Sequence, residues 1–406
     1  MPAASVSGVA RYRRLVTAPG AAAPLVLGTL ARLPIGMTGL GLLLLVQQET
    51  GSFAWGGAVS GAYSAALAVA SPLRGTAVDR RGPAAVLRAH GAVYPLALLA
   101  TVAAALAHLP APVLLVLAAL SGAAFPPVGA LVRSLWGLLF EDDADRATAY
   151  ALDAVLIELA FVGGPLLVGV AVALGSPALA VGLSAALVAF GSLLLARAEV
   201  TARLVPHSDA PRAPLRAPLL SAPVRELLLA MVLFGIAFGA TEVAVAAYAV
   251  DERAKHLAGP ILATWAAGSV IGGLAYGARD WGAPAHRQYP WLVGLLGLAF
   301  LLPLAAPNPV SLAVLLLVAG AAIAPFSACN SALLARVAPP GASTATFAWS
   351  GSCIVAGAAT GIGVAGWLVD DVGTTASFLL AAAAGLLALA VAILRRRYVG
   401  PGVEAG

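Results

Sequence analysis

The sequence predicts an all-α membrane protein with twelve transmembrane helices arranged as two six-helix bundles. Of its 406 residues, 61% are hydrophobic and 10% are charged, whereas a soluble domain carries about 25% charged residues. Twelve apolar segments have a length suited to a hydrocarbon core, which needs about 20 residues per helix. Their approximate limits are 22–47, 52–74, 83–108, 111–139, 147–173, 178–196, 223–249, 259–279, 290–306, 310–336, 343–369 and 374–394.

A polar segment rich in proline divides the twelve spans into two sets of six. It runs from Arg197 to Ala222 and is the longest polar interruption in the chain. Proline at this density prevents one continuous helix. We therefore predict an N-terminal bundle over residues 1–198, a cytoplasmic linker over 199–222 and a C-terminal bundle over 223–406.

The distribution of basic residues predicts which side each loop occupies. If the N-terminus is cytoplasmic, 20 of the 23 Lys and Arg residues lie in cytoplasmic segments or at the membrane margins beside them. The external loops then hold only Arg253 and Lys255, and Arg32 lies inside a span. Since cytoplasmic loops carry the excess of positive charge, we predict a multi-pass protein with both termini in the cytoplasm.

Composition and motifs also exclude several functional classes. The net charge is +5, but the basic residues are dispersed between apolar spans, so nucleic-acid binding is not expected. Cys329 and Cys353 fall in different apolar segments, which indicates neither a disulfide framework nor a metal site. The chain contains no phosphate-binding loop, no His-Glu metal spacing and no G-x-S-x-G or Cys-x-x-Cys motif. We therefore expect no enzymatic activity and no cofactor.

The most specific pattern is the polar stretch Gly75–Gly82 between the second and third spans, which we predict to be a turn. Gly75 and Gly82 permit close backbone approach or a positive φ. Asp79 supplies a fixed negative charge, and Arg80 with its basic neighbours suits anionic lipid head groups. In sequence order the stretch reads G-x-x-x-D-R-x-G.

This pattern resembles the signature loop of the major facilitator superfamily, although Ala77 stands where leucine is usual and Pro83 where a basic residue is usual. A degenerate counterpart, Gly272–Asp280, follows the eighth span, as expected for paired halves of a transporter. The resemblance implies that Asp79 meets the start of span 11 at Thr344–Thr346, where a helix N-terminus favours negative charge. The gating residues that it implies are Gly75, Asp79, Arg80 and Gly82.

Two glycine-rich segments carry further expectations. Gly163–Gly169 in span 5 resembles the glycine–proline motif of superfamily antiporters, with its last glycine one place late, and Pro165 would kink the helix. It favours export and adds Pro165 to the gating residues; an ordinary packing helix remains the alternative. The small-residue face Gly357–Gly366 of span 11 is expected to pack against span 2 or span 8. By contrast, Arg133 lies too far from the start of span 4 to match the family's fourth-helix motif and is interpreted as an anchor at the cytoplasmic margin.

Ionisable residues within the spans are costly and usually face a partner or a water-filled cavity. In one interpretation Arg32 and Glu158 form a buried pair between spans 1 and 5, and Glu242 is satisfied by Thr241 or Tyr248. In the other, Glu158 or Glu242 carries a proton across the membrane. The resemblance implies that spans 1, 4, 7 and 10 line the cavity. The charged candidates for substrate or proton binding are Arg32, Asp153, Glu158 and Glu242.

Aromatic and amide residues in the C-terminal spans suggest a wall for an amphipathic solute. Most aromatic residues in such spans only pack or form membrane belts, so both interpretations stay open. The candidate solute contacts are Tyr248, Trp265, Asn330 and Trp349.

The function implied by the resemblance is secondary transport by alternating access in a bacterial inner membrane. We expect proton-coupled efflux of a small amphipathic compound by a monomer, driven by the proton gradient and surrounded by anionic lipids. The first alternative is an importer or uniporter of a sugar, amino acid or other small nutrient. A non-transporting membrane sensor is the second, and the absence of a recognisable soluble domain argues against it.

Overall fold

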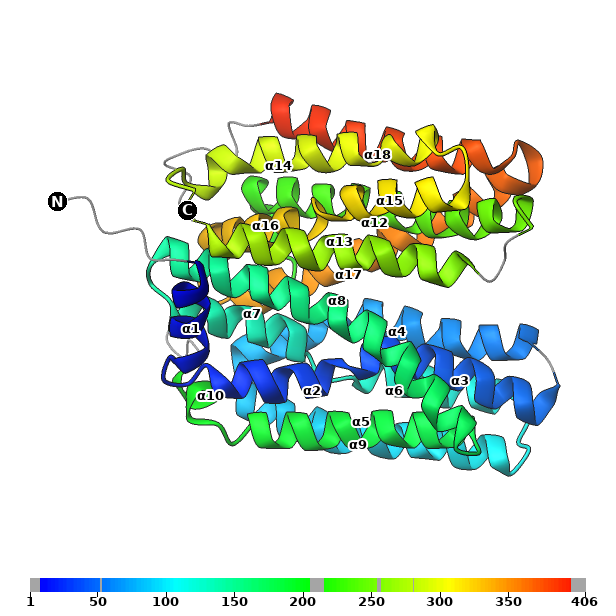
Figure 1. The fold of residues 1–406 in the computed structure, drawn as a ribbon. Coiled ribbons are helices and arrows are strands. Elements are labelled where there is room, and N and C mark those ends of the chain that lie inside the picture. Colours follow the sequence, from blue (N-terminus) through cyan, green and yellow to red (C-terminus); the bar gives the residue numbers. More distant parts are fainter. Residues whose placement is uncertain (1–7, 52, 205–214, 254–256, 280, 396–406) are drawn as a thin grey trace.

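The computed structural model describes residues 8–51, 53–204, 215–253, 257–279 and 281–395 as helices joined by short connections. Figure 1 shows two stacks of roughly parallel helices, with the N-terminal half of the chain in one stack and the C-terminal half in the other. Helix α1 (Gly8–Thr17) and the last turns of α18 (Thr374–Leu394) lie at the same end of the molecule. This arrangement agrees with the expected even number of crossings.

The N-terminal half contains six spans, two of which are built from more than one helical segment. In chain order they are η1 (Ala23–Leu27) with α2 (Gly28–Arg32) and α3 (Pro34–Thr50), then α4 (Phe53–Arg81), α5 (Pro83–Leu106), α6 (Ala111–Ala124) with α7 (Val128–Leu139), α8 (Asp143–Ala173) and α9 (Pro177–Leu195).

Two short helices, α10 (Glu199–Arg203) and α11 (Ala217–Leu220), occupy the described parts of the linker. Pro206, Pro211 and Pro214 lie outside the described residues. Six further spans follow: α12 (Ala222–Asp251), α13 (Ala258–Ala278), α14 (Ala285–Ala299) with η3 (Leu302–Ala305), α15 (Pro309–Gly320) with α16 (Ile323–Val337), α17 (Ser343–Asp371) and α18.

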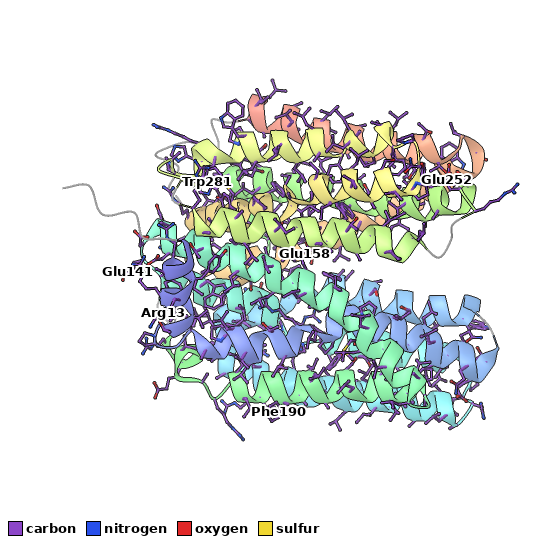
Figure 2. All side chains as sticks on the ribbon, viewed as in Figure 1. Arg13, Glu141, Glu158, Phe190, Glu252 and Trp281 are labelled. Atoms are coloured by element: carbon purple, nitrogen blue, oxygen red, sulfur yellow. The ribbon has the colours of Figure 1, made fainter. Side chains whose placement is uncertain are left out.

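Eleven of these spans, among the described residues, are long and apolar enough to cross a membrane, and α4 lies alongside them as the twelfth long helix. Large apolar side chains cover the outside of the molecule: Leu166, Phe190 and Trp291 are 66%, 60% and 82% exposed. Figure 2 shows Phe190 on the outer surface of the N-terminal half. Exposed apolar surface of this extent is suited to lipid.

The stretch predicted to be a polar turn is helical for most of its length. Helix α4 continues to Arg81, and only Gly82, with φ at +83°, breaks the chain before α5 begins at Pro83. Gly75 lies inside α4, where an added Cβ would come within 2.9 Å of Ala345 Cα on α17. Gly82 is thus needed for a left-handed backbone and Gly75 for close helix contact.

Spans 1, 4 and 10 are interrupted rather than continuous. Span 4 breaks at Phe125–Pro127, where consecutive prolines lack the N–H groups that a helix requires. Span 10 breaks at Ala321–Ala322, and span 1 changes segment at Leu33, ahead of Pro34. Helix α8, in contrast, runs through Pro165 without a break.

The prediction for the small-residue face of span 11 is wrong. An added Cβ at Gly357 or Gly361 would collide with the carbonyls of Val232 and Ile236 on α12, so this face packs inside the C-terminal half. A different part of α17, from Thr344 to Ser352, meets α4 across the interface between the halves. Two parts of α17 thus pack against different helices, one against α12 and the other against α4.

Candidate functional site at the interface between the halves

Asp79 joins the two halves through the start of α17. Its Oδ1 accepts a hydrogen bond from the Thr344 backbone N–H at 3.0 Å, and its Oδ2 accepts one from Ala345 N–H at 2.8 Å. These N–H groups belong to the first turn of a helix, which lacks internal acceptors and carries partial positive charge. The predicted contact between Asp79 and Thr344–Thr346 is confirmed.

Other hydrogen bonds between the halves gather at the same end of the molecule, which we call the Asp79 end. The hydroxyl groups of Ser134 and Thr344 are hydrogen-bonded to each other at 3.2 Å, and the Thr148 hydroxyl donates to the Gly277 carbonyl at 2.8 Å. Ser352 donates to the Ala68 carbonyl at 2.8 Å. These residues lie in the later parts of α4, α7 and α13 and the earlier parts of α8 and α17, so the interface is closed at the Asp79 end.

Helix α1 adds a strap across this closed end. Its Tyr12 hydroxyl donates to the Leu274 carbonyl at 3.0 Å, and lies so close to Gly277 that an added Cβ there would collide with it. On the other side, Arg14 forms an ion pair of 3.7 Å with Asp145 of α8. Burial raises the pKa of Tyr12 to about 12, so its hydroxyl remains a donor at neutral pH.

A buried charge cluster lies within the N-terminal half. Arg32 of α2 donates through Nη1 to Asp153 Oδ1 at 2.6 Å, and Arg133 of α7 donates through Nε to Asp153 Oδ2 at 3.2 Å. Trp136 Nε1 adds a longer contact of 3.4 Å to the same carboxylate. Asp153 and Arg32 are 1% and 2% exposed and Arg133 is 19% exposed, so one carboxylate and two guanidinium groups share a largely buried site.

The predicted pair of Arg32 with Glu158 is therefore wrong, and Asp153 takes that place. The two acids are five residues apart on α8, which separates them by about 140° around the helix axis. Glu158 instead accepts a hydrogen bond of 3.1 Å from Ser269 of α13. Figure 2 shows Glu158 at the boundary between the two halves, far from the ends marked by Glu141 and Glu252.

The sequence matches the family model of the Major Facilitator Superfamily over residues 25–283 and 283–406, which is nearly the whole chain. The chain belongs to the major facilitator superfamily. A search of curated protein sequences found no match.

Solved structures of superfamily transporters share the fold of this member. A bacterial homologue of the iron transporter ferroportin in an outward-facing state aligns with a TM-score of 0.76 at 16% identity, over 92% of this chain and 98% of its own. The human organic anion transporter MFSD10 aligns with a TM-score of 0.71 at 18% identity, over 93% of this chain and 99% of its own. The transporter FucP in its outward conformation aligns with a TM-score of 0.65 at 16% identity, over 93% of this chain and 98% of its own. At these identities the likeness describes the fold, and this superfamily member is a transporter rather than an enzyme.

The acidic residue of span 7 in this transporter does not use its predicted partners. Glu242 is half-buried on α12. The Thr241 hydroxyl donates instead to the Ala237 carbonyl, and the Tyr248 hydroxyl to the Ala306 carbonyl. Among the described residues Glu242 has no hydrogen bond or ion pair. Its role in proton or substrate binding stays a prediction.

The predicted solute contacts lie on four different helices of the C-terminal half, α12, α13, α16 and α17. Trp265 is buried and stacks on Phe238 at 4.7 Å between ring centroids. Asn330 is 1% exposed, and its Oδ1 has no hydrogen-bond partner among the described residues. The Trp349 indole donates to the Leu215 carbonyl of the linker, at the Asp79 end.

Sequence reasoning missed several residues of this region, among them Tyr12, Ser134, Thr148 and Ser352, and two of them, Arg133 and Ser269, bind the buried acids of α8. Arg133 was interpreted as a margin anchor, yet it is 19% exposed and bound to the buried Asp153. Ser269 carried no signal because a serine within an apolar span is common. For Arg133 a signal was available: Trp136 follows three residues later, on the same helix face, and places an indole N–H beside the same carboxylate.

Proposed function

We propose that this superfamily member exports a small amphipathic compound from a bacterial cell in exchange for protons, by alternating access across the inner membrane. The basic residues favour a cytoplasmic location for the Asp79 end. With that orientation the closed end faces the cytoplasm, and the structure corresponds to an outward-facing arrangement. The glycine–proline segment around Pro165 supports export over import.

The observation that carries the proposal is the hydrogen bond between Glu158 and Ser269. It places a carboxylate near the middle of α8, about 22 Å along the helix from Asp143, at a contact between the halves. If the halves rock apart there, Glu158 loses the hydroxyl donor. A neutral carboxylic acid is less costly to move through that environment than an anion. Glu158 is thus suited to bind a proton on one side and release it on the other.

The surroundings proposed for the transporter follow from its surface. The exposed basic residues at the Asp79 end would contact anionic lipid head groups, and we expect a monomer that requires no cofactor beyond the proton gradient. Iron, named for the ferroportin homologue, is not proposed as cargo. In the described part of the chain, no three His, Cys, Asp or Glu side chains lie close enough together to hold a metal ion.

The proposal is tested with purified protein in liposomes under an imposed pH gradient. A thermal-shift screen first identifies a ligand, because a compound that binds the folded state raises its melting temperature. Transport of that ligand should then depend on the gradient. Glu158→Gln should abolish gradient-driven transport but preserve exchange of labelled for unlabelled substrate. A glutamine still accepts a hydrogen bond from the Ser269 hydroxyl, but it takes up no proton.

Glu141→Gln is the matched control, because Glu141 is exposed at the Asp79 end (Figure 2) and loses the same charge. It should transport at the wild-type rate. Gradient-driven transport at the wild-type rate by Glu158→Gln would remove Glu158 as the proton carrier. If transport by the wild type does not depend on the gradient, the protein is better described as a uniporter. If the gradient drives transport in the direction opposite to export, the importer is favoured.

A further inference from the structure

The buried cluster of Arg32, Asp153 and Arg133 has an excess of positive charge. Two guanidinium groups face one carboxylate, and the remaining polar neighbours are neutral: the Trp136 indole donates to Asp153, and the Tyr150 hydroxyl donates to the Arg133 carbonyl. Asp153 lies ten residues into α8, about 15 Å along the helix. A net charge of +1 within a membrane-embedded bundle is costly unless an anion accompanies it.

Several N–H donors of the two arginines are left for such an anion. Arg32 donates through Nε to the Gly28 carbonyl and through Nη1 to Asp153. Its Nη2 is buried and has no hydrogen-bond partner among the described residues. Arg133 contacts Asp153 only through Nε, and its terminal nitrogens make no hydrogen bond to the described residues. A planar guanidinium group is suited to carboxylate, phosphate and sulfonate oxygens.

Arg133 connects the buried cluster to the surface. Arg133 is 19% exposed, while Arg32 and Asp153 are almost fully enclosed. The next residue, Ser134, contacts Thr344 across the closed interface. Arg133 is therefore the member of the cluster that solvent reaches, and it lies one residue before the contact between α7 and α17 that closes the Asp79 end.

We propose that Arg32 and Arg133 bind the acidic group of the transported compound, which is therefore an organic anion, and that Asp153 positions the two guanidinium groups. This assignment deepens the proposed transport function by naming its substrate class. It is independent of the direction of transport and of proton coupling by Glu158.

Binding to purified protein in lipid nanodiscs tests the assignment without any gradient. The probes are benzoate, benzenesulfonate and phenyl phosphate, each compared with the uncharged benzamide or benzyl alcohol, at low and at high concentrations of chloride. Binding is measured as the ligand-dependent shift in melting temperature. Arg133→Gln removes the excess charge but keeps the pair of Arg32 with Asp153, so it is expected to fold. Arg88→Gln is the matched control, since it removes an exposed arginine at the same end.

At least one acid should stabilise the wild type and Arg88→Gln, whereas its uncharged partner should not. In Arg133→Gln the dissociation constant should rise at least about tenfold, and Arg133→Lys should restore part of the affinity because it restores the charge without the planar fork. Equal shifts for acids and uncharged partners, unchanged binding in Arg133→Gln, or no stabilisation by any acid would each overturn the assignment. Stabilisation by chloride alone, with no further effect of the acids, would identify an inorganic counter-ion and overturn the substrate class.

Discussion

Replacing Asp79 with asparagine should open the closed end of the transporter. The carboxylate accepts two backbone N–H groups of α17, one through each oxygen. Asparagine has nearly the same shape but only one acceptor oxygen, and its NH₂ group would face the second backbone N–H. The substitution therefore removes one hydrogen bond and the negative charge at the helix N-terminus, without creating a cavity.

The size of the effect follows from these two losses. A hydrogen bond to a charged group contributes about 1.5–3 kcal/mol, and a charge at a helix N-terminus about 0.3–1 kcal/mol. The closed end should be destabilised by about 2–4 kcal/mol relative to the open one. At 1.4 kcal/mol per factor of ten, this raises the open-to-closed ratio on the order of 30- to 700-fold.

Distance measurement by electron paramagnetic resonance can detect this change. Spin labels at Arg88→Cys on α5 and Arg287→Cys on α14 are exposed, lie in different halves and sit at the Asp79 end. Cys329 and Cys353 are first replaced by alanine so that only these positions are labelled. The long-distance population should increase strongly in Asp79→Asn.

The control is Asp143→Asn, which removes the same charge at the same end. Asp143 is exposed and pairs only within its own helix, with Arg146, so the distance distribution should match that of the parent protein. If Asp79→Asn also leaves the distribution unchanged, the two hydrogen bonds do not hold the interface closed, and the gating role of Asp79 is refuted.

Two further predictions concern α1 and the packing of α17. Tyr12→Phe removes the hydrogen bond to the Leu274 carbonyl, which contributes about 0.5–1.5 kcal/mol, and should raise the open-to-closed ratio about 2- to 12-fold by the same distance measurement; an unchanged ratio would exclude a strap. Because burial raises the Tyr12 pKa from 10.0 to about 12, this contact should be fully present below pH 10 and weaken between pH 10 and 12, in the wild type but not in Tyr12→Phe. Gly361→Leu should lower the melting temperature and the yield of folded protein, since its side chain meets the Ile236 carbonyl, whereas Gly363→Leu, which has no neighbouring atom within 4 Å, should not; equal effects would refute the packing argument.

The interior of α8 shows how far the sequence could specify the site. Asp153 and Glu158 were both recognisable as costly charges within a span, and their depth followed from counting residues. Their partners depend on how α8 is rotated relative to α2, α7 and α13. Five residues of separation place the two acids on different faces, so one meets arginines within its own half and the other meets Ser269 of the opposite half. No local sequence pattern determines how α8 is rotated relative to these helices.

The sequence by itself determined that this chain is a membrane protein of apolar helices, and it indicated that Asp79, close to Gly82, meets the start of α17. Hydropathy and turn chemistry are properties of contiguous residues, and twelve apolar segments leave few other arrangements. Only the tertiary structure decided that Asp153 binds two arginines and that the glycines of α17 serve α12 rather than α4. Apart from the contact between Arg133 and Asp153, which are 20 positions apart, these contacts join residues more than a hundred positions apart, and all of them depend on the rotation and spacing of packed helices.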